Sequence, residues 1–170
     1  MLSSQTRDEA TSAACRALAQ LCSPLPLSAA VLRTKSEEQI LDAVRPVSFY
    51  KTKATRILKI CDVLLDRYGG DIPPDAAGLL ALPGVGPKVM TLVMDLAWQD
   101  SVGICVDTHV HRISNRLGWV KTWKRSGADG RARSQVPELT RAALEAWLPR
   151  PLWSEVNFLL VGFGQEVSTR

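Results

Sequence analysis

Helical periodicity runs through almost the whole chain and leaves little room for a sheet. Apolar residues recur at spacings of three and four in successive segments, and prolines or glycine pairs stand between those segments. Residues 102–106 form the only plausible strand, which is too short and isolated to build a sheet. The sequence therefore predicts an all-α orthogonal bundle of about seven or eight helices in one domain, residues 1–170. The expected helices span residues 6–21, 36–44, 50–68, 75–81, 87–98, 108–117, 137–147 and 151–163.

Capping residues support several of these helix starts. Ser36 is followed three residues later by Gln39, the spacing of a capping box. Thr6 is a candidate cap for the first helix, and Asp107 is the natural cap for the helix that begins at residue 108.

The charge of the chain is mildly basic and unevenly distributed. Lys and Arg number 21 against 17 Asp and Glu, a net charge of +4, which permits a phosphate-bearing partner without requiring one. The excess lies in residues 121–135, and we expect residues 122–136 to be a flexible basic insertion. No apolar run is long enough to span a membrane, and the N-terminus has no secretory or transit pattern. We therefore expect a soluble intracellular protein without a membrane partner.

The cysteines and histidines do not have the spacing of metal ligands. No two of the four cysteines form a C-x-x-C pair, which argues against a closed zinc or iron–sulfur site. Cys15 and Cys22 are seven residues apart and would share a helix face, which favours core packing. His109 and His111 are two apart on a predicted helix and cannot bind one ion together.

A glycine-containing turn, LPGVGPK at residues 82–88, lies between two predicted helices. The glycines allow positive φ and close approach of another backbone, and Pro87 suits the first position of a helix. The amides of Gly84 and Gly86, with Val85 between them, would face outward toward a phosphate, as in a helix-hairpin-helix that binds a nucleic-acid backbone. A tight turn without any ligand is the alternative.

Lys88 and Asp107 are the candidate reactive residues. Lys88 lies in the first turn of its helix, where the positive end of the helix dipole disfavours a cation and favours the neutral, nucleophilic amine. An exposed lysine that only holds a phosphate is the alternative for Lys88, and an ordinary helix cap is the alternative for Asp107. Together, an amine and a carboxylate suit attack on a sugar carbon with loss of a base. Composition alone does not select this chemistry.

The combination of LPGVGPK at residues 82–88 and VDTHVHR at residues 106–112 resembles the endonuclease III family of DNA glycosylases. The similarity extends through MLSSQT at 1–6, YGGDIP at 68–73, WLP at 147–149 and LVGFG at 160–164, nearly the whole chain, and is greatest with the eukaryotic homologues. The resemblance implies a bifunctional glycosylase and AP lyase that excises oxidised pyrimidines.

The resemblance also implies roles for individual residues. Lys88 matches the Schiff-base nucleophile, Asp107 the catalytic carboxylate, and Gln5 a side chain that fills the gap left by an extruded base. Gln5 could otherwise be a solvated residue at a helix start. The remaining candidate DNA contacts are Gly84, Val85, Gly86, Thr108, His109 and Arg112.

Three departures from the family pattern shape the remaining expectations. The ligands of the family's [4Fe-4S] cluster are absent from this chain, so we expect it to hold no cofactor. The family's helices before residue 2 are also missing, which suggests truncation at both ends. The third departure is the long segment 122–136. With fewer packing partners, Leu18, Leu21, Phe158 and Leu159 are expected to expose apolar surface.

Two functions from different classes remain open at this stage. The first is the glycosylase/AP lyase, acting as a monomer on double-stranded DNA with a damaged pyrimidine or an abasic site. By the same resemblance it would reside in the nucleus, with the mitochondrion as a second location. The second is a non-catalytic module that binds the DNA backbone, because a helix-hairpin-helix can bind DNA without catalysing a reaction.

Overall fold

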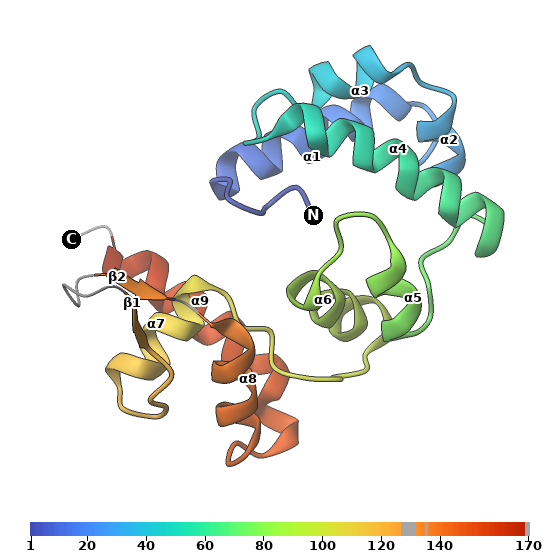
Figure 1. Cartoon of the computed structure of the whole chain (residues 1–170). Helices are drawn as coiled ribbons and strands as arrows, with labels where there is room; N and C mark the ends of the chain where they lie inside the picture. Colours follow the sequence, from blue (N-terminus) through green and yellow to red (C-terminus); the bar gives the residue numbers. More distant parts are fainter. Residues whose placement is uncertain (127–131, 135, 169–170) are drawn as a thin grey trace. The chain divides into compact units, whose positions relative to one another are not determined.

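The computed structural model describes residues 1–126, 132–134 and 136–168 of the chain. The helices and strands follow one another without a central sheet (Figure 1), which confirms the predicted all-α class. Two compact units divide the chain, Met1–Gly86 and Pro87–Arg170. The elements are α1 (Asp8–Cys22), α2 (Ala29–Arg33), α3 (Glu37–Ala43), α4 (Tyr50–Arg67), α5 (Ala76–Ala81), α6 (Pro87–Trp98), α7 (Thr108–Arg116), β1 (Lys124–Ser126), β2 (Ala132–Ser134), α8 (Pro137–Glu145), a 3-10 turn (Arg150–Leu152) and α9 (Trp153–Ser168).

In the first unit, α2 and α3 pack against α4, and α1 packs against α3. Ser36 and Gln39 form the predicted capping box at the start of α3, and the Asp75 side chain caps α5. Helix α2 was not predicted, because its five residues are too few to show a period. The core includes Ala14, Leu18, Cys22, Ile40, Ala54, Ile57 and Cys61.

Two predictions about α1 are wrong. Cys22 is buried, but Cys15 is exposed, because only part of the face that they share packs against a neighbour. Thr6 does not cap the helix: Arg7 occupies the cap position and makes no side-chain cap bond. The Thr6 hydroxyl instead donates to Ser4 O at 3.1 Å.

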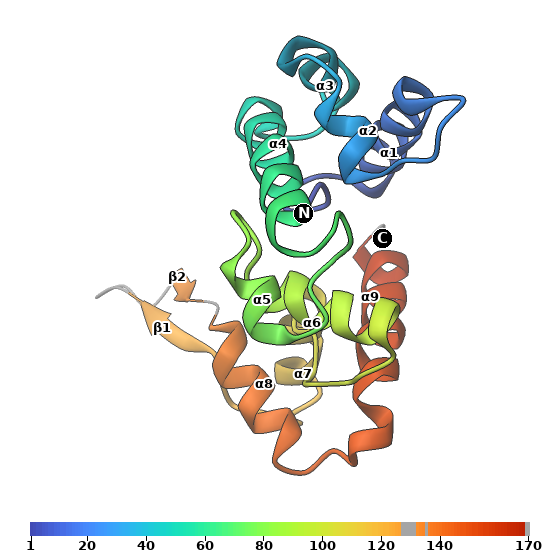
Figure 2. The same cartoon turned by 90° about the vertical axis from the view of Figure 1, so that its right-hand side faces the viewer.

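In the second unit, α7 packs against both α8 and α9 (Figure 2). The apolar face of α7 supplies Val110 and Ile113 to a core that also receives side chains from α8, α9 and the segment before α7. Burying each such side chain stabilises the unit by about 1.5–3 kcal/mol. The remaining members of this core are Ile104, Val106, Val120, Leu144, Val156 and Leu160.

The strands do not lie where the sequence suggested. Residues 103–106 are buried but belong to no ladder, whereas β1 and β2 form an antiparallel pair with Arg125 opposite Arg133. Both strands fall inside the expected insertion 122–136, of which residues 127–131 and 135 lie outside the described part. A ladder is made by backbone groups, so a polar pair of strands gives no hydropathy signal. Flexibility of the insertion stays a prediction.

The expected exposure of apolar surface is confirmed on α9 and not on α1. Phe158 and Leu159 are 53% and 67% exposed, whereas Leu18 is only 4% exposed. Leu18 faces the interior of the first unit, and Leu21 is half-buried. None of the described helices is both long and apolar enough to cross a membrane.

Candidate active site

The hairpin turn at residues 82–86 has the predicted positive φ at Gly84 but not at Gly86. Gly84 adopts φ +79°, and the Val85 N–H donates to Leu82 O at 3.1 Å, which closes the turn. The Val85 amide is therefore used internally. Within the described residues, the amides of Gly84 and Gly86 have no hydrogen-bond acceptor, so they remain available to an anion.

Arg56 of α4 lies against this turn. A Cβ at Gly84 would come within 2.7 Å of Arg56 Cδ, and the guanidinium group is exposed. The positive φ is the reason that this position favours glycine, since the exposed arginine side chain could move away from a Cβ. The arginine places a positive charge next to the two free amides.

Lys88 is the second residue of α6, directly after Pro87 at the helix start. Its side chain is exposed, which is also what the alternative of a phosphate-holding lysine requires. Its carbonyl oxygen accepts a hydrogen bond from the Cys105 thiol at 3.6 Å. That bond ties the first turn of α6 to the segment that precedes α7.

Asp107 is the N-cap of α7, as predicted. Its Oδ1 accepts from the Val110 N–H at 2.8 Å, and its backbone is extended, with φ −103° and ψ −169°. The carboxylate is half-buried. One oxygen thus fixes the side chain, and the other has no hydrogen-bond partner among the described residues.

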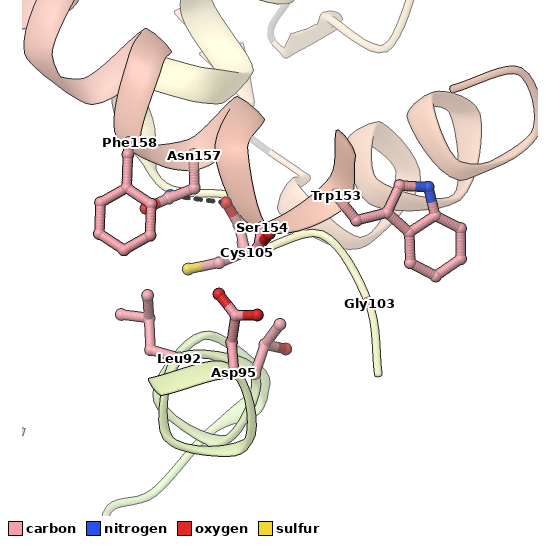
Figure 3. Close-up of a pocket in the computed structure, with 9 residues that line it drawn as sticks. Leu92, Asp95, Gly103, Cys105, Trp153, Ser154, Asn157 and Phe158 are labelled. Atoms are coloured by element: carbon pink, nitrogen blue, oxygen red, sulfur yellow. Dashed lines mark hydrogen bonds between the residues drawn. The ribbon is translucent and has the colours of Figure 1, made fainter. Parts of the chain in front are cut away.

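Cys105 lies close to both candidate reactive groups. Burial raises the pKa of its thiol to about 11; the Lys88 charge opposes this shift, and the charges of Asp107 and Asp95 add to it. Figure 3 shows Cys105 between Asp95 of α6 and Asn157 of α9, in a small pocket. Lys88 and Asp107 therefore lie within electrostatic range of one sulfur atom.

Gln5 lies in a segment fixed by a buried lysine. Gln5 is exposed and adopts φ +52°. Lys53 of α4 is 3% exposed, and its Nζ donates to Leu2 O at 2.7 Å, Ser4 O at 2.8 Å and Thr6 Oγ1 at 3.0 Å. Burial lowers the pKa of Lys53. The lysine thus binds the backbone before Gln5 and the hydroxyl of the residue after it.

The three other candidates on α7 differ in their surroundings. Thr108 is exposed. Arg112 Nη2 lies 3.2 Å from His109 Nδ1 and donates to Gly164 O at 3.3 Å, which ties both side chains to α9. A role of Thr108, His109 and Arg112 in binding DNA stays a prediction.

A buried polar network holds the remainder of α7. His111 is fully buried, its Nδ1 lies 2.6 Å from Thr140 Oγ1, and that oxygen lies 2.6 Å from Thr122 Oγ1. Asn115 donates to Thr122 Oγ1 at 2.9 Å and accepts from the Thr122 N–H at 2.8 Å. Burial lowers the pKa of His111. The network connects α7 to α8.

With this geometry established, comparison with known proteins gives the family. Residues 1–142 match the HhH-GPD superfamily of base excision DNA repair proteins. The chain belongs to this superfamily.

Individual relatives agree with the predicted resemblance to endonuclease III. Endonuclease III homolog 2, chloroplastic, of Arabidopsis thaliana is 47% identical, and the match covers 99% of this chain and 42% of that protein. Endonuclease III-like protein 1 of Gallus gallus is 46% identical, with 98% and 54% covered. The chain thus spans about half the length of these relatives.

A solved structure is also similar. A trapped endonuclease III–DNA covalent intermediate matches with a TM-score of 0.76 and 28% identity, covering 91% of this chain and 65% of that one. The HhH-GPD fold is thereby confirmed.

The residues present do not fit the [4Fe-4S] cluster that the resemblance to endonuclease III implies. The sequence has four cysteines; Cys15 is exposed, Cys22 and Cys61 are buried in the first unit, and Cys105 is buried in the second. Among the described residues, no three side chains of His, Cys, Asp or Glu come together as metal ligands.

Four residues of the site were not predicted from the sequence: Lys53, Arg56, Glu145 and Asn157. Lys53 had a detectable signal, because it occupies the core register of α4 with Ile57, Cys61 and Leu64. Arg56, Glu145 and Asn157 had none, since their contacts join segments far apart in the sequence.

Proposed function

We propose that this HhH-GPD protein is a bifunctional DNA glycosylase and AP lyase that excises oxidised pyrimidines from double-stranded DNA. One observation carries the proposal. The amine-bearing first turn of α6 and the carboxylate that caps α7 belong to one unit and are joined by the hydrogen bond from Cys105 to Lys88 O. This link between α6 and the segment that leads to Asp107 supports a site in which Lys88 is the nucleophile and Asp107 the acid–base group.

Binding begins at the DNA backbone. The free amides of Gly84 and Gly86 and the exposed guanidinium of Arg56 provide donors and a positive charge for phosphate groups. Such contacts position the duplex without reading its sequence. The damaged nucleotide is then extruded, and Gln5 enters the gap in the duplex. Lys53 supports this step by binding the backbone carbonyls of Leu2 and Ser4 and the side-chain hydroxyl of Thr6.

The chemistry follows from the two side chains. The neutral Lys88 amine attacks C1′ of the sugar, the bond between C1′ and the base breaks, and the base leaves with a proton. Asp107 stabilises the positive charge that develops on the sugar, accepts a proton from the attacking amine and passes it to the departing base. When the sugar ring opens, the bond between C1′ and O4′ breaks, O4′ takes a proton from water, and a Schiff base forms between Lys88 and C1′. Loss of a proton from C2′ then expels the 3′ phosphate, and hydrolysis frees the amine.

The protein acts in this proposal as a monomer and without a cofactor of its own. In the proposed steps, Lys88 supplies the nucleophile and Asp107 transfers the protons. We place the activity in the nucleus or the mitochondrion, where damaged double-stranded DNA is present.

Borohydride trapping on DNA with an abasic site tests the proposal. Borohydride reduces the Schiff base to a stable amine, so the wild-type chain should form a covalent adduct and Lys88→Ala should form none. Binding to undamaged duplex should weaken only modestly in Lys88→Ala, with a salt slope lower by about one. Lys121→Ala, an exposed lysine in the same unit, is the control and should form the adduct normally.

A non-catalytic DNA-binding module is the second candidate, favoured by the free hairpin amides, which need neither Lys88 nor Asp107. Binding by the wild-type chain without an adduct would support this module and contradict the lyase.

A further inference from the structure

We propose that Asn157 and Glu145 are positioning residues that set the location of the Asp107 carboxylate relative to Lys88. The proposal rests on the function proposed above. Neither residue needs to touch the substrate. Both act on residues 103–106, which we call the spacer and which lead directly to Asp107.

Asn157 holds the spacer from α9. Its side chain is 7% exposed, and its Nδ2 donates to Cys105 O at 2.7 Å. Figure 3 shows this bond between α9 and the spacer. The acceptor belongs to a residue with no ladder partner, so the side chain satisfies a buried carbonyl that regular structure does not.

Glu145 holds the spacer from α8. Its Oε1 accepts from the Ile104 N–H at 2.8 Å, and Arg141 Nε lies 3.9 Å from the same oxygen. A Cβ at Gly103 would lie 2.9 Å from this oxygen. Glycine at residue 103 is therefore what allows the carboxylate to reach the next amide.

Two consecutive residues of the spacer, Ile104 and Cys105, make all three contacts with the helices. The Ile104 N–H is bound by α8, Cys105 O by α9, and the Cys105 thiol binds Lys88 O in α6. Asp107 follows two residues after Cys105. The bonds from Glu145 and Asn157 are made by side chains, so each can be removed by one substitution while the helices remain intact. Small displacements of a reacting group reduce rates steeply, and the spacer is the segment through which such a displacement would reach Asp107.

The experiment compares base excision, DNA binding and amide exchange in the full chain. The variants are Asn157→Leu, Asn157→Ser, Glu145→Leu and Glu145→Gln, with Val156→Ala as the control. In Asn157→Ser the new side chain is too short to reach Cys105 O, and it disturbs packing less than leucine does. In Glu145→Gln the amide oxygen still accepts from the Ile104 N–H. Val156→Ala weakens the core of the same unit without removing a hydrogen bond from the spacer.

We expect single-turnover excision at saturating protein to fall about tenfold or more in Asn157→Leu, Asn157→Ser and Glu145→Leu. The Kd for a duplex with an uncleavable abasic analogue should change less than about twofold, because the hairpin that binds the backbone is untouched. Glu145→Gln and Val156→Ala should stay within about threefold of the wild-type rate. Amide exchange at Ile104 should accelerate in Glu145→Leu and remain slow in Glu145→Gln. All rates are measured at a temperature where melting curves show each variant folded.

Excision rates in the Asn157 and Glu145 variants equal to that of Val156→Ala would overturn the positioning role and leave the proposed function intact. Rates of Glu145→Gln and Glu145→Leu that fall equally would overturn it as well. If the wild-type chain forms no Lys88 adduct and excises no base, the proposed function fails and the positioning role fails with it.

Discussion

Two short irregular segments each carry one candidate site residue, Gln5 in the first and Asp107 directly after the second. The two segments are held in different ways. Residues 1–6 present Gln5. The buried ammonium group of Lys53 binds three acceptors in this segment, and the Ser48 N–H donates to Thr6 Oγ1 at 3.1 Å. The spacer, residues 103–106, presents Asp107 and is fixed by separate groups from α8, α9 and α6. In the first arrangement one side chain makes most of these contacts, and in the second each contact comes from a different helix.

The difference follows from what each presented residue has to do. In the proposed function, Gln5 fills a gap in DNA, which requires a loop of fixed shape but tolerates small displacements of its amide. Asp107 transfers protons, which requires a position accurate to a fraction of an ångström. A single charged anchor is sufficient for the first task. The second benefits from contacts on several sides.

Asp107→Asn tests the catalytic role of Asp107 while keeping its role as a helix cap. We expect it to have the largest effect on activity. Asparagine retains a side-chain oxygen that can cap α7, so the melting temperature should change little. Excision and lyase rates should fall by about 10² or more, as for a lost acid–base group. The measurements are single-turnover rates on damaged duplex and a melting curve. A variant with nearly wild-type activity would reduce Asp107 to a helix cap.

Lys53→Met tests whether one anchor really holds the first segment. Methionine matches the length of the lysine stem but donates no hydrogen bond, so Leu2 O, Ser4 O and Thr6 Oγ1 lose a shared donor. We expect a loss of about 1–3 kcal/mol in the free energy of unfolding, measured by urea denaturation. Amide exchange in residues 2–6 should accelerate.

Lys51→Met is the matched control, because Lys51 is an exposed lysine on the same helix. It should leave both the stability and the exchange rates near wild type. Equal behaviour of the two variants would show that residues 1–6 are held by something other than Lys53.

The pH dependence of the free energy of unfolding tests the buried His111 network, which holds α7 after Asp107. We expect this effect to be the smallest. Burial lowers the pKa of His111, so the unfolded chain, with a His pKa of about 6.5, binds the proton more readily. The stability that neutral His111 contributes is therefore complete above about pH 6.5 and is lost as the pH falls below that value. Between pH 7.5 and 5.5 we expect the wild type to lose up to about 1 kcal/mol more than His111→Asn, measured by urea denaturation.

If His111→Asn kept the same dependence as the wild type, another group would be responsible for it.

Sequence patterns predicted what is local in this molecule. The capping box at Ser36, the cap at Asp107, proline at the start of α6 and the positive φ of Gly84 each follow from residues close in sequence. The ends of the expected helices agree with the observed ones to within two residues, except that α9 continues five residues past the expected end at residue 163 and that the short α2 was not predicted.

Long-range polar contacts could not be predicted in the same way. Glu145 lies 41 residues from Ile104 and Asn157 lies 52 residues from Cys105, and neither side chain belongs to a motif. Asp107 illustrates the limit. Its capping role can be predicted from the sequence, but the groups that fix the backbone before it can be identified only from the folded structure.

The buried network behind Asp107 also has a direction. Each hydroxyl hydrogen finds an acceptor when Asn115 donates to Thr122, Thr122 donates to Thr140, and Thr140 donates to His111 Nδ1. In that orientation the proton of neutral His111 is on Nε2, a buried nitrogen with no hydrogen-bond partner among the described residues. A second proton would occupy Nδ1 and turn that nitrogen from an acceptor into a donor. Thr140 and Thr122 would then have to rotate, and the Thr122 hydrogen would lose its acceptor. The hydrogen bonds from Asn115 to His111 therefore all point in one direction, and protonation of His111 would reverse the bonds nearest to it.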